Sequence, residues 1–313
     1  MGAAVVSGSG RSRHSVPVVP TLHVLGAGRT ARTLARLGRE AGVWSVGQVC
    51  NRRPDRACVA VDWIGEGTAT ARFEPMAPSD WLMIGLPDSA IADRVSQGVP
   101  GRPGLAFHLS GAEPASLLEG LAEAVASVHP VCAFADPDRA LSAFPGSFAV
   151  GEGDPAALDR LLPAFEAIGA RTLRFRPANK RLYHASMIAA SNFLCTLDAL
   201  ALDLAEAGGL SAEQALSLIA TLQSGALGTI AEQGPARALT GPIERGDSAT
   251  CATLVEQVKA HGATDESFRT RVEPLLMALG RATVQLVRRK QGEDRADRAD
   301  LAAVEAVFAE PHG

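Results

Sequence analysis

The sequence predicts an α/β fold, a doubly wound and mostly parallel sheet, followed by an all-α region. Segments with the pattern of buried strands alternate with amphipathic helical segments up to about residue 176, as in a parallel sheet covered on both faces by helices. Beyond residue 177 only helical patterns remain, interrupted by glycine-rich loops. The 313 residues suffice for two domains, which we expect at 20–176 and 177–313, after a disordered tail at 1–19.

The first expected strand, Leu22–Leu25, leads into a glycine turn and then a helix. Gly26 and Gly28 make the turn, and Ala31 takes the third position of a G-x-G-x-x-A motif. Such a turn brings backbone N–H groups and the positive end of a helix close to a pyrophosphate. Directly after the first strand of an alternating pattern, the motif predicts dinucleotide binding. The residues expected to make this contact are Gly26, Ala27, Gly28, Arg29 and Thr30.

The second expected strand, Trp44–Cys50, indicates which dinucleotide is bound. In NAD-binding folds an acidic residue about twenty positions past the glycines binds the ribose diol. Here the strand is followed by Asn51, Arg52 and Arg53, without Asp or Glu. A guanidinium fork suits a 2′-phosphate, so we expect NADP rather than NAD. The alternative is that the two arginines are solvated in a surface loop.

The remaining elements of the first domain alternate in the same way. Strands are expected where apolar runs stop at a proline or a serine-glycine pair, and helices where apolar residues recur at helical spacing. The expected strands are Asp80–Asp88, Leu105–Ser110, Val125–Val128, Phe148–Val150 and Arg171–Phe175, and the expected helices are Pro114–Ala126 and Pro155–Ile168.

Three of these strands are followed by residues that can contact a cofactor or a substrate. Ligands of doubly wound folds bind beyond the carboxyl ends of the strands, which share one edge of the sheet. We expect three pairs that follow strand ends to lie at this edge, namely Pro87-Asp88, Ser110-Gly111 and His129-Pro130. The residues expected to lie near the nicotinamide are Leu86, Pro87, Asp88 and Ser110.

The helical region opens with a segment of unusual composition, Lys180 to Asn192. Lys180, His184 and Ser191 fall on one helical face, and Asn192 lies beside it. A lysine in a first turn opposes the helix dipole by about 0.3–1 kcal/mol, which suggests an anionic ligand nearby. The alternatives are that Lys180 is an exposed surface cation, that His184 is a hydrogen-bonded core histidine and that Asn192 makes an interhelical hydrogen bond.

Two further features of the helical region bear on function. The apolar stretch Leu182–Leu204 contains polar residues, so we expect a buried core helix rather than a membrane span. The loop at 238–247 contains two glycines and a proline and presents Thr240, Arg245 and Asp247 as candidate substrate ligands. The alternative for this loop is a polar helix connection with an internal Arg–Asp pair.

Composition excludes several classes of function. A net charge of −4 with 20% charged residues gives no sign of nucleic-acid or membrane binding. The five cysteines include no C-x-x-C pair, so we expect reduced thiols in a cytoplasmic protein. No histidine and cysteine spacing indicates a metal site.

Taken in order, the motifs resemble a known family. The chain resembles the Rossmann-like oxidoreductases whose helical C-terminal domain is of unknown function, and the segments that carry the resemblance are Gly26–Gly28, Leu86–Asp88, His108–Ala112, His129-Pro130, Lys180–Asn192 and Ala238–Asp247. These oxidoreductases are related to pyrroline-5-carboxylate reductase, ketopantoate reductase and 6-phosphogluconate dehydrogenase. The resemblance covers about 22–289. It implies an NADP-type cofactor, an active site between the domains, and a homodimer through the helical domain.

These observations predict an NADPH-dependent reductase of a small keto or imino acid. Hydride transfer needs a proton donor, for which Lys180, His184 and His129 are candidates, since a histidine ionises near neutral pH. Asn192 or Ser110, together with Ser191, can hydrogen-bond the carbonyl or imine. Arg245 can hold a carboxylate by a bidentate fork. The alternatives are a prephenate-dehydrogenase-like oxidative decarboxylase and a non-catalytic NADP-sensing regulator.

Overall fold

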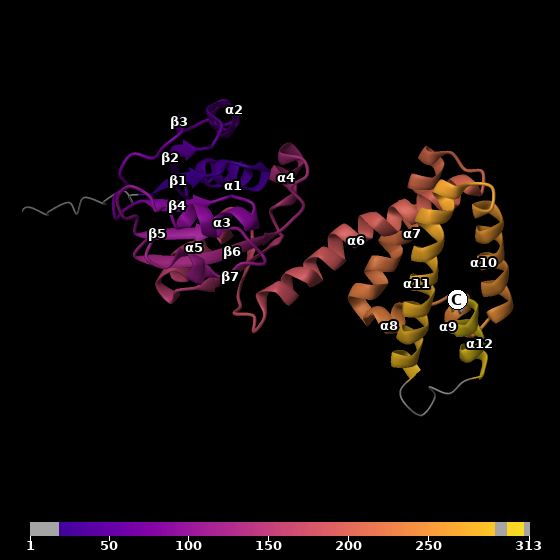
Figure 1. The fold of residues 1–313 in the computed structure, drawn as a ribbon. Coiled ribbons are helices and arrows are strands. Elements are labelled where there is room, and N and C mark those ends of the chain that lie inside the picture. Colours follow the sequence, from indigo (N-terminus) through magenta and orange to yellow (C-terminus); the bar gives the residue numbers. More distant parts are fainter. Residues whose placement is uncertain (1–18, 292–298, 310–313) are drawn as a thin grey trace, which may run out of the picture. The chain divides into compact units, whose positions relative to one another are not determined.

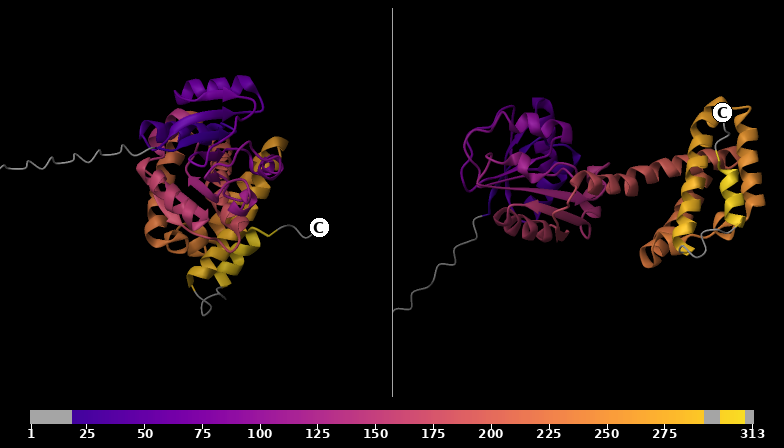
Figure 2. Two further views of the ribbon diagram at one scale, coloured as in Figure 1. Left: turned by 90° about the vertical axis from the view of Figure 1, so that its left-hand side faces the viewer. Right: turned by 60° about the horizontal axis from the view of Figure 1, so that its bottom comes forward.

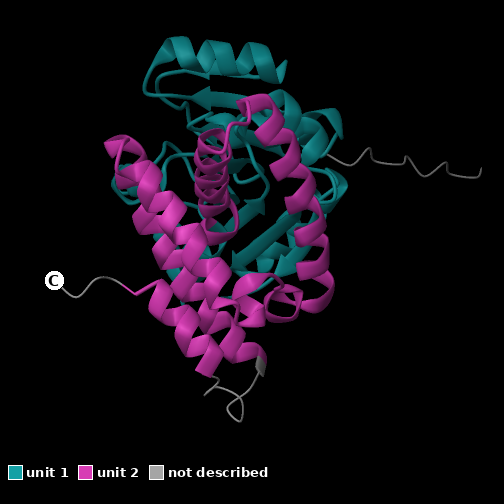
Figure 3. Ribbon diagram, turned by 90° about the vertical axis from the view of Figure 1, so that its right-hand side faces the viewer, with its two compact units in different colours: residues 1–187 teal, residues 188–313 magenta. Residues whose placement is uncertain are grey.

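The computed structural model describes residues 19–291 and 299–309, so the predicted tail at 1–19 lies almost wholly outside the described residues. The chain divides into two compact units, Met1–Met187 and Ile188–Gly313 (Figure 3). This division falls inside a long helix, and the second unit begins at Ile188 where the sequence predicted a domain start at 177.

The first unit is built on one sheet (Figure 1), in which the described residues form eight strands in the order β3-β2-β1-β4-β5-β6-β7-β8. All neighbouring strands are parallel except β6 and β7, which are antiparallel. The strands are β1 Thr21–Leu25, β2 Ser45–Cys50, β3 Thr68–Thr70, β4 Trp81–Ile84, β5 Leu105–His108, β6 Ala124–Val131, β7 Phe148–Gly153 and β8 Arg171–Arg174. The predicted doubly wound, mostly parallel sheet is therefore confirmed.

Two apolar clusters show that both faces of the sheet are covered. Because side chains alternate along a strand, Met83 of β4 enters one cluster while its neighbours Leu82 and Ile84 enter the other. The first cluster includes residues of α1, α2 and α5, and the second includes residues of α3 and the 3₁₀ helix η1. The helical bounds are α1 Arg29–Glu40, α2 Pro54–Ile64, α3 Asp88–Val95, η1 Ala115–Leu118, α4 Pro137–Ala143 and α5 Pro155–Ala167.

The helix expected at Pro114–Ala126 is wrong. The segment forms only the short η1 and then the strand β6. Gly120 lies between them with φ +83°, a left-handed conformation that ends a helix and that glycine adopts without strain. From Ala124 on, the chain pairs with β5, so sheet formation prevails over the helical propensity of the alanines and leucines.

The second unit is helical (Figure 2), as the sequence predicts. Its main core joins α10, α11 and α12 through residues such as Val255, Val284 and Val304. A smaller cluster packs Leu200 of α6 against Phe268 and Val272 of α11. The helices are α6 Lys180–Ala207, whose first two turns belong to the first unit, α7 Ala212–Gln233, α8 Pro235–Ala238, α9 Pro242–Arg245, α10 Ser248–Gly262, α11 Glu266–Gln291 and α12 Ala299–Val307.

The expectation that α6 is a buried core helix is wrong for the single chain. Leu200 is the one residue of α6 that is buried, and Phe193 is 62% exposed. Among the described helices, α6 alone has the length and mean hydropathy, 1.5, that a membrane span would need. Length and composition are weak evidence for a span, because an apolar helix covered by another protein surface has the same composition.

Candidate functional site

The glycine turn between β1 and α1 has the predicted strand–turn–helix geometry. Gly26 has φ +81°, and its N–H donates to the Cys50 carbonyl at 2.8 Å. A Cβ on Gly26 would lie 2.6 Å from the Leu86 side chain and 3.1 Å from the Gly85 carbonyl oxygen. Glycine is therefore required there, both for the backbone conformation and for the approach of β1 to the end of β4. Gly28 precedes Arg29, the first residue of α1.

A cavity of about 940 Å³ begins at this turn and is lined by five arginines. It includes Gly26, Leu86 and Pro87 together with the predicted trio that follows β2. No acidic residue lines it within the described chain, although Arg53 pairs with the neighbouring Asp55 at 2.7 Å. The cationic and amide residues of its wall are Asn51, Arg52, Arg53, Arg56, Arg72, Arg94 and Gln97.

The chemistry of this cavity fits a dinucleotide with an additional phosphate. The side chains of Arg52, Arg56 and Arg72 have no ion-pair partner among the described residues, whereas Arg94 donates to the Gly98 carbonyl at 3.0 Å. Guanidinium groups without a carboxylate partner favour a phosphate ligand. Sequence reasoning missed Arg56, Arg72 and Arg94 because they come from three separate segments that only the fold brings together.

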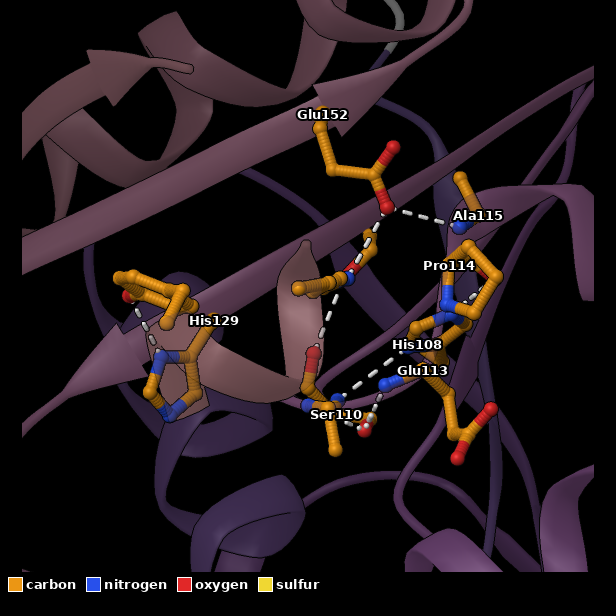
Figure 4. Close-up of polar contacts among 11 residues, drawn as sticks. His108, Ser110, Glu113, Pro114, Ala115, His129 and Glu152 are labelled. Carbon is orange, nitrogen blue, oxygen red and sulfur yellow. Dashed lines mark hydrogen bonds and ion pairs between the residues drawn. The ribbon is translucent and has the colours of Figure 1, made fainter. Parts of the chain in front are cut away.

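The loop after β5 is held in place by the buried His108 (Figure 4). The Ser110 N–H donates to its Nδ1 at 3.2 Å, so Nε2 carries the proton and donates to the Pro114 carbonyl at 3.1 Å. Burial lowers the pKa of His108 to about 4, which keeps the ring neutral. The predicted residue Ser110 is buried here, and its Oγ accepts hydrogen bonds from the N–H groups of Ala112 and Glu113.

Lys180, predicted from its place in a first helical turn, lies against this loop. Its ammonium donates to Ser127 Oγ at 2.5 Å and to Glu152 Oε1 at 2.9 Å. Ser127 in turn donates to the Ser110 carbonyl at 3.1 Å, and Glu152 also accepts from the Ala115 N–H at 2.8 Å. Burial lowers the pKa of Lys180, and the hydrogen bond to Glu152 opposes that change.

Two histidines of the first unit, His129 and His184, lie close to Gly111. A Cβ there would lie 2.4 Å from His184 Nδ1 and 2.9 Å from His129 Nε2. His129 Nδ1 is hydrogen-bonded to the Tyr183 hydroxyl at 2.9 Å (Figure 4), and the rings of His129 and His184 lie edge to face at 5.8 Å. Burial lowers the pKa of His129 to about 4, so this ring is neutral at pH 7. His184 Nδ1 is buried without a hydrogen-bond partner.

His129 and Pro130 do not follow a strand end, as the sequence had suggested, but lie inside β6. The strand continues to Val131 because β7 pairs with it antiparallel, with His129 opposite Val150. β6 therefore runs past the end of β5, whose last residue His108 pairs with Ser127. His129 still reaches Gly111, one residue past Ser110.

For the other predicted residues the structure shows local contacts of their own. Asp88 is the first residue of α3, and Arg29 donates to the Ala135 carbonyl at 2.9 Å. In the second unit, Ser191 donates to the Asn192 amide oxygen at 2.9 Å, and both are exposed. Thr240 is exposed between α8 and α9, and Arg245 ends α9. Asp247 caps α10 through the Thr250 N–H at 3.0 Å and hydroxyl at 2.7 Å.

Sequence reasoning missed Ser127, Glu152, Tyr183 and His108 as members of the site. Ser127 and Glu152 are polar residues in largely apolar strands, which is unusual but does not by itself indicate a shared partner. Glu152 comes from β7, which runs antiparallel to its neighbour β6. Its place in the site could therefore not be predicted from the rule that ligands bind at the carboxyl ends of parallel strands. No group of three or more metal-binding side chains occurs among the described residues.

Comparisons with known proteins agree with this geometry. Residues 147–283 match the family model "Domain of unknown function (DUF2520)". No curated protein sequence matches the chain.

Three solved structures illustrate the likeness in fold. Protein TM1727 from Thermotoga maritima is 22% identical with a TM-score of 0.63, and the match covers 88% of this chain and 100% of that one. BF3122 from Bacteroides fragilis, provisionally described as an NADP oxidoreductase, is 20% identical with a TM-score of 0.65. The match covers 80% of this chain and 96% of that one. Pyrroline carboxylate reductase from Plasmodium falciparum with NADP bound is 10% identical with a TM-score of 0.52. The match covers 94% of this chain and 100% of that one.

The comparisons agree with the observed fold and with the match of the C-terminal segment. The chain combines a Rossmann-like α/β unit with a helical region, as its structural neighbours among the NADP oxidoreductases do, and its segment 147–283 matches the DUF2520 domain.

Proposed function

We propose that this protein is an NADPH-dependent oxidoreductase that reduces the C=N or C=O bond of a small imino or keto acid. One observation carries the proposal. The first unit holds both an arginine-lined cavity that starts at the glycine turn and a buried lysine ammonium beside the loop that follows β5. The first suits a phosphorylated dinucleotide, and the second suits protonation of a reduced nitrogen or oxygen.

The residues that would hold the cofactor follow the ends of four strands, β1, β2, β4 and β5. Gly26, Ala27 and Gly28, with Arg29 and Thr30 of α1, would bind the pyrophosphate at the helix N-terminus. Asn51, Arg52 and Arg53 would bind the adenosine ribose and its 2′-phosphate, aided by Arg56 and Arg72. The remainder of the cofactor site would be lined by Leu86, Pro87, Asp88 and Ser110. When bound, NADPH would supply the hydride.

Lys180 is the group best suited to supply the proton. An ammonium has three N–H donors, and Ser127 and Glu152 accept two of them. The third remains for a substrate nitrogen or oxygen. His129 is less suited because its neutral ring carries no acidic proton at pH 7. His184 brings a buried, unpaired ring nitrogen close to Gly111, where a substrate group can become its partner.

The proposed substrate class is supported by the resemblance and by a neighbour of similar fold. A neighbour of similar fold is named a pyrroline carboxylate reductase, which acts on a cyclic imino acid. In this protein Ser191 and Asn192 would hydrogen-bond the substrate, and Thr240, Arg245 and Asp247 would complete its binding. Arg245 is suited to a carboxylate because its fork matches two oxygens.

The proposed assembly is a homodimer formed through the helical unit. The support is the apolar surface of α6 and α7, where Phe193 is 62% and Leu222 76% exposed. Exposed apolar surface of this kind is unusual on a monomer and is typical of an interface. Light scattering at micromolar concentration should give twice the chain mass, and a monomeric mass would reject the dimer.

The test of function is a titration followed by turnover. NADPH should bind the full-length protein more tightly than NADH by calorimetry. NADPH oxidation should then be measured with pyrroline-5-carboxylate and with small 2-keto acids. Loss of turnover in Lys180→Met, with NADPH binding retained, supports the assignment. Tight NADPH binding without turnover on any compound would favour a cofactor-sensing regulator, and full activity of Lys180→Met would exclude this lysine as the proton donor.

A further inference from the structure

Glu152 is the acidic residue in contact with Lys180, and it comes from a strand that the sequence did not associate with the site. Its side chain is 12% exposed and that of Lys180 is 10% exposed. One carboxylate oxygen, Oε1, accepts both the lysine N–H at 2.9 Å and the Ala115 N–H at 2.8 Å. The backbone of the loop after β5 thus fixes the carboxylate, and the carboxylate fixes the lysine.

We propose that Glu152 is a positioning residue that acts through Lys180, holding its ammonium against Ser127 so that one N–H is left to donate to substrate. The inference rests on the proposed function. Glu152 lies on β7 opposite Ser127 on β6, and the two side chains bind the same ammonium nitrogen. An ammonium with two of its three donors bound has one remaining direction in which to donate.

The same contact determines whether the lysine carries the proton it must give. Burial lowers the pKa of Lys180, and Glu152 is the strongest of the groups that raise it. Asp88 at the start of α3 and Glu113 in the loop after β5 also raise it, from a greater distance. The neighbouring rings of His108 and His129 are neutral at pH 7, since the pKa of each lies at about 4. Removing the Glu152 charge therefore leaves the ammonium buried without a contacting anion.

A cavity beside this pair makes the lysine accessible to a small reagent. Its volume is about 880 Å³, and both Lys180 and Glu152 line it, together with Glu119 at its wall. Amines react with acetic anhydride only in the neutral form. The labelling rate of Lys180 as a function of pH, followed by mass spectrometry of its peptide, therefore reports its protonation without a substrate.

The experiment compares the full-length wild-type protein with Glu152→Gln, Glu152→Asp and Glu119→Gln. In Glu152→Gln the labelling midpoint of Lys180 should move to lower pH, and labelling at neutral pH should rise roughly 10-fold or more, because an opposite charge in contact shifts proton affinity at least that much. The labelling midpoint in Glu152→Asp should lie between those of the wild type and Glu152→Gln. Glu119→Gln, which alters the same cavity wall, should have the midpoint of the wild type. A change in access alone would alter the plateau rate and leave the midpoint in place.

An unchanged midpoint in folded Glu152→Gln would overturn the inference. If Glu152→Gln does not fold, the labelling midpoint of Lys180 is measured in Glu152→Asp and Ser127→Ala instead. Unchanged midpoints in both variants would likewise overturn the inference. The proposed function fails separately, through absence of NADPH binding or retained turnover in Lys180→Met. Where turnover is found, Glu152→Gln should lower it roughly 100-fold, as expected for a misplaced donor, and should shift the alkaline limb of the pH profile in the same direction as the labelling midpoint.

Discussion

Adding one methyl group at Gly111 tests how closely α6 must approach the sheet. A Cβ at this position would lie 2.4 Å from His184 Nδ1, 2.9 Å from His129 Nε2 and 3.0 Å from His129 Cε1. All three distances lie well inside van der Waals contact, and both rings are held, one by Tyr183 and the other by α6 itself. Gly111→Ala should therefore destabilise the protein by about 1–3 kcal/mol, as overpacking does.

Thermal melting measures the effect, with Gly225→Ala as the matched control. Gly225 is exposed in α7, and a Cβ there meets no atom within 4 Å, so the control should be neutral or gain about 0.5–1 kcal/mol from helix propensity. Gly111→Ala should lower the melting temperature by roughly 2–4 °C per kcal/mol. Because the clash is with His184, adding His184→Ala to Gly111→Ala should cost less than His184→Ala costs alone. A melting curve equal to that of the wild type, or strictly additive costs, would refute this account of the packing.

Three further changes test the cofactor cavity, the histidine over Gly111 and the buried rings. Arg52→Ala with Arg53→Ala should weaken NADPH by about 1.5–3 kcal/mol and NADH far less, and equal losses in calorimetry would count against a 2′-phosphate site. His184→Asn should leave melting and NADPH affinity nearly intact and lower turnover by roughly 10²–10⁴, whereas full activity in a destabilised variant would make His184 a packing residue. The free energy of unfolding should fall as pH drops from 6.5 to about 4. In this range His108 and His129 bind protons in the unfolded chain, whereas in the folded chain their lowered pKa keeps them neutral. Urea titrations at several pH values measure this dependence, and a flat profile would contradict the burial argument.

Much of the first unit follows from local sequence, and the reasons are physical. β1, the glycine turn and α1 were predictable because apolar periodicity and the need for glycine at φ +81° are local properties. β4 and β5 were predictable for the same reason, although they end at Ile84 and His108, before the expected Asp88 and Ser110. The arginines of the cofactor cavity beyond Arg53 were not, since Arg56, Arg72 and Arg94 become neighbours only through the fold.

Two errors at the candidate site share one origin, the pairing of β6 with an antiparallel strand. That pairing carries β6 on to Val131, past the end of β5, so His129 lies inside a strand where the sequence suggested a strand end. It also brings Glu152 opposite Ser127, and no local pattern indicates that a glutamate on one strand and a serine on another will share an ammonium. Lys180 was identifiable because a cation in a first helical turn is locally unfavourable, while its partners were not.

The short η1 explains why these residues form a site. A full crossover helix between β5 and β6 would cover the face of the sheet on which Ser127 and Glu152 stand. Gly120, at φ +83°, limits that crossover to the single turn Ala115–Leu118. The uncovered polar side chains need partners, because buried serine and glutamate are costly when unpaired. The start of α6 supplies the ammonium that satisfies both. A helix that replaced η1 would therefore stabilise the sheet and exclude Lys180, so the truncated crossover is the structural condition for the proposed chemistry.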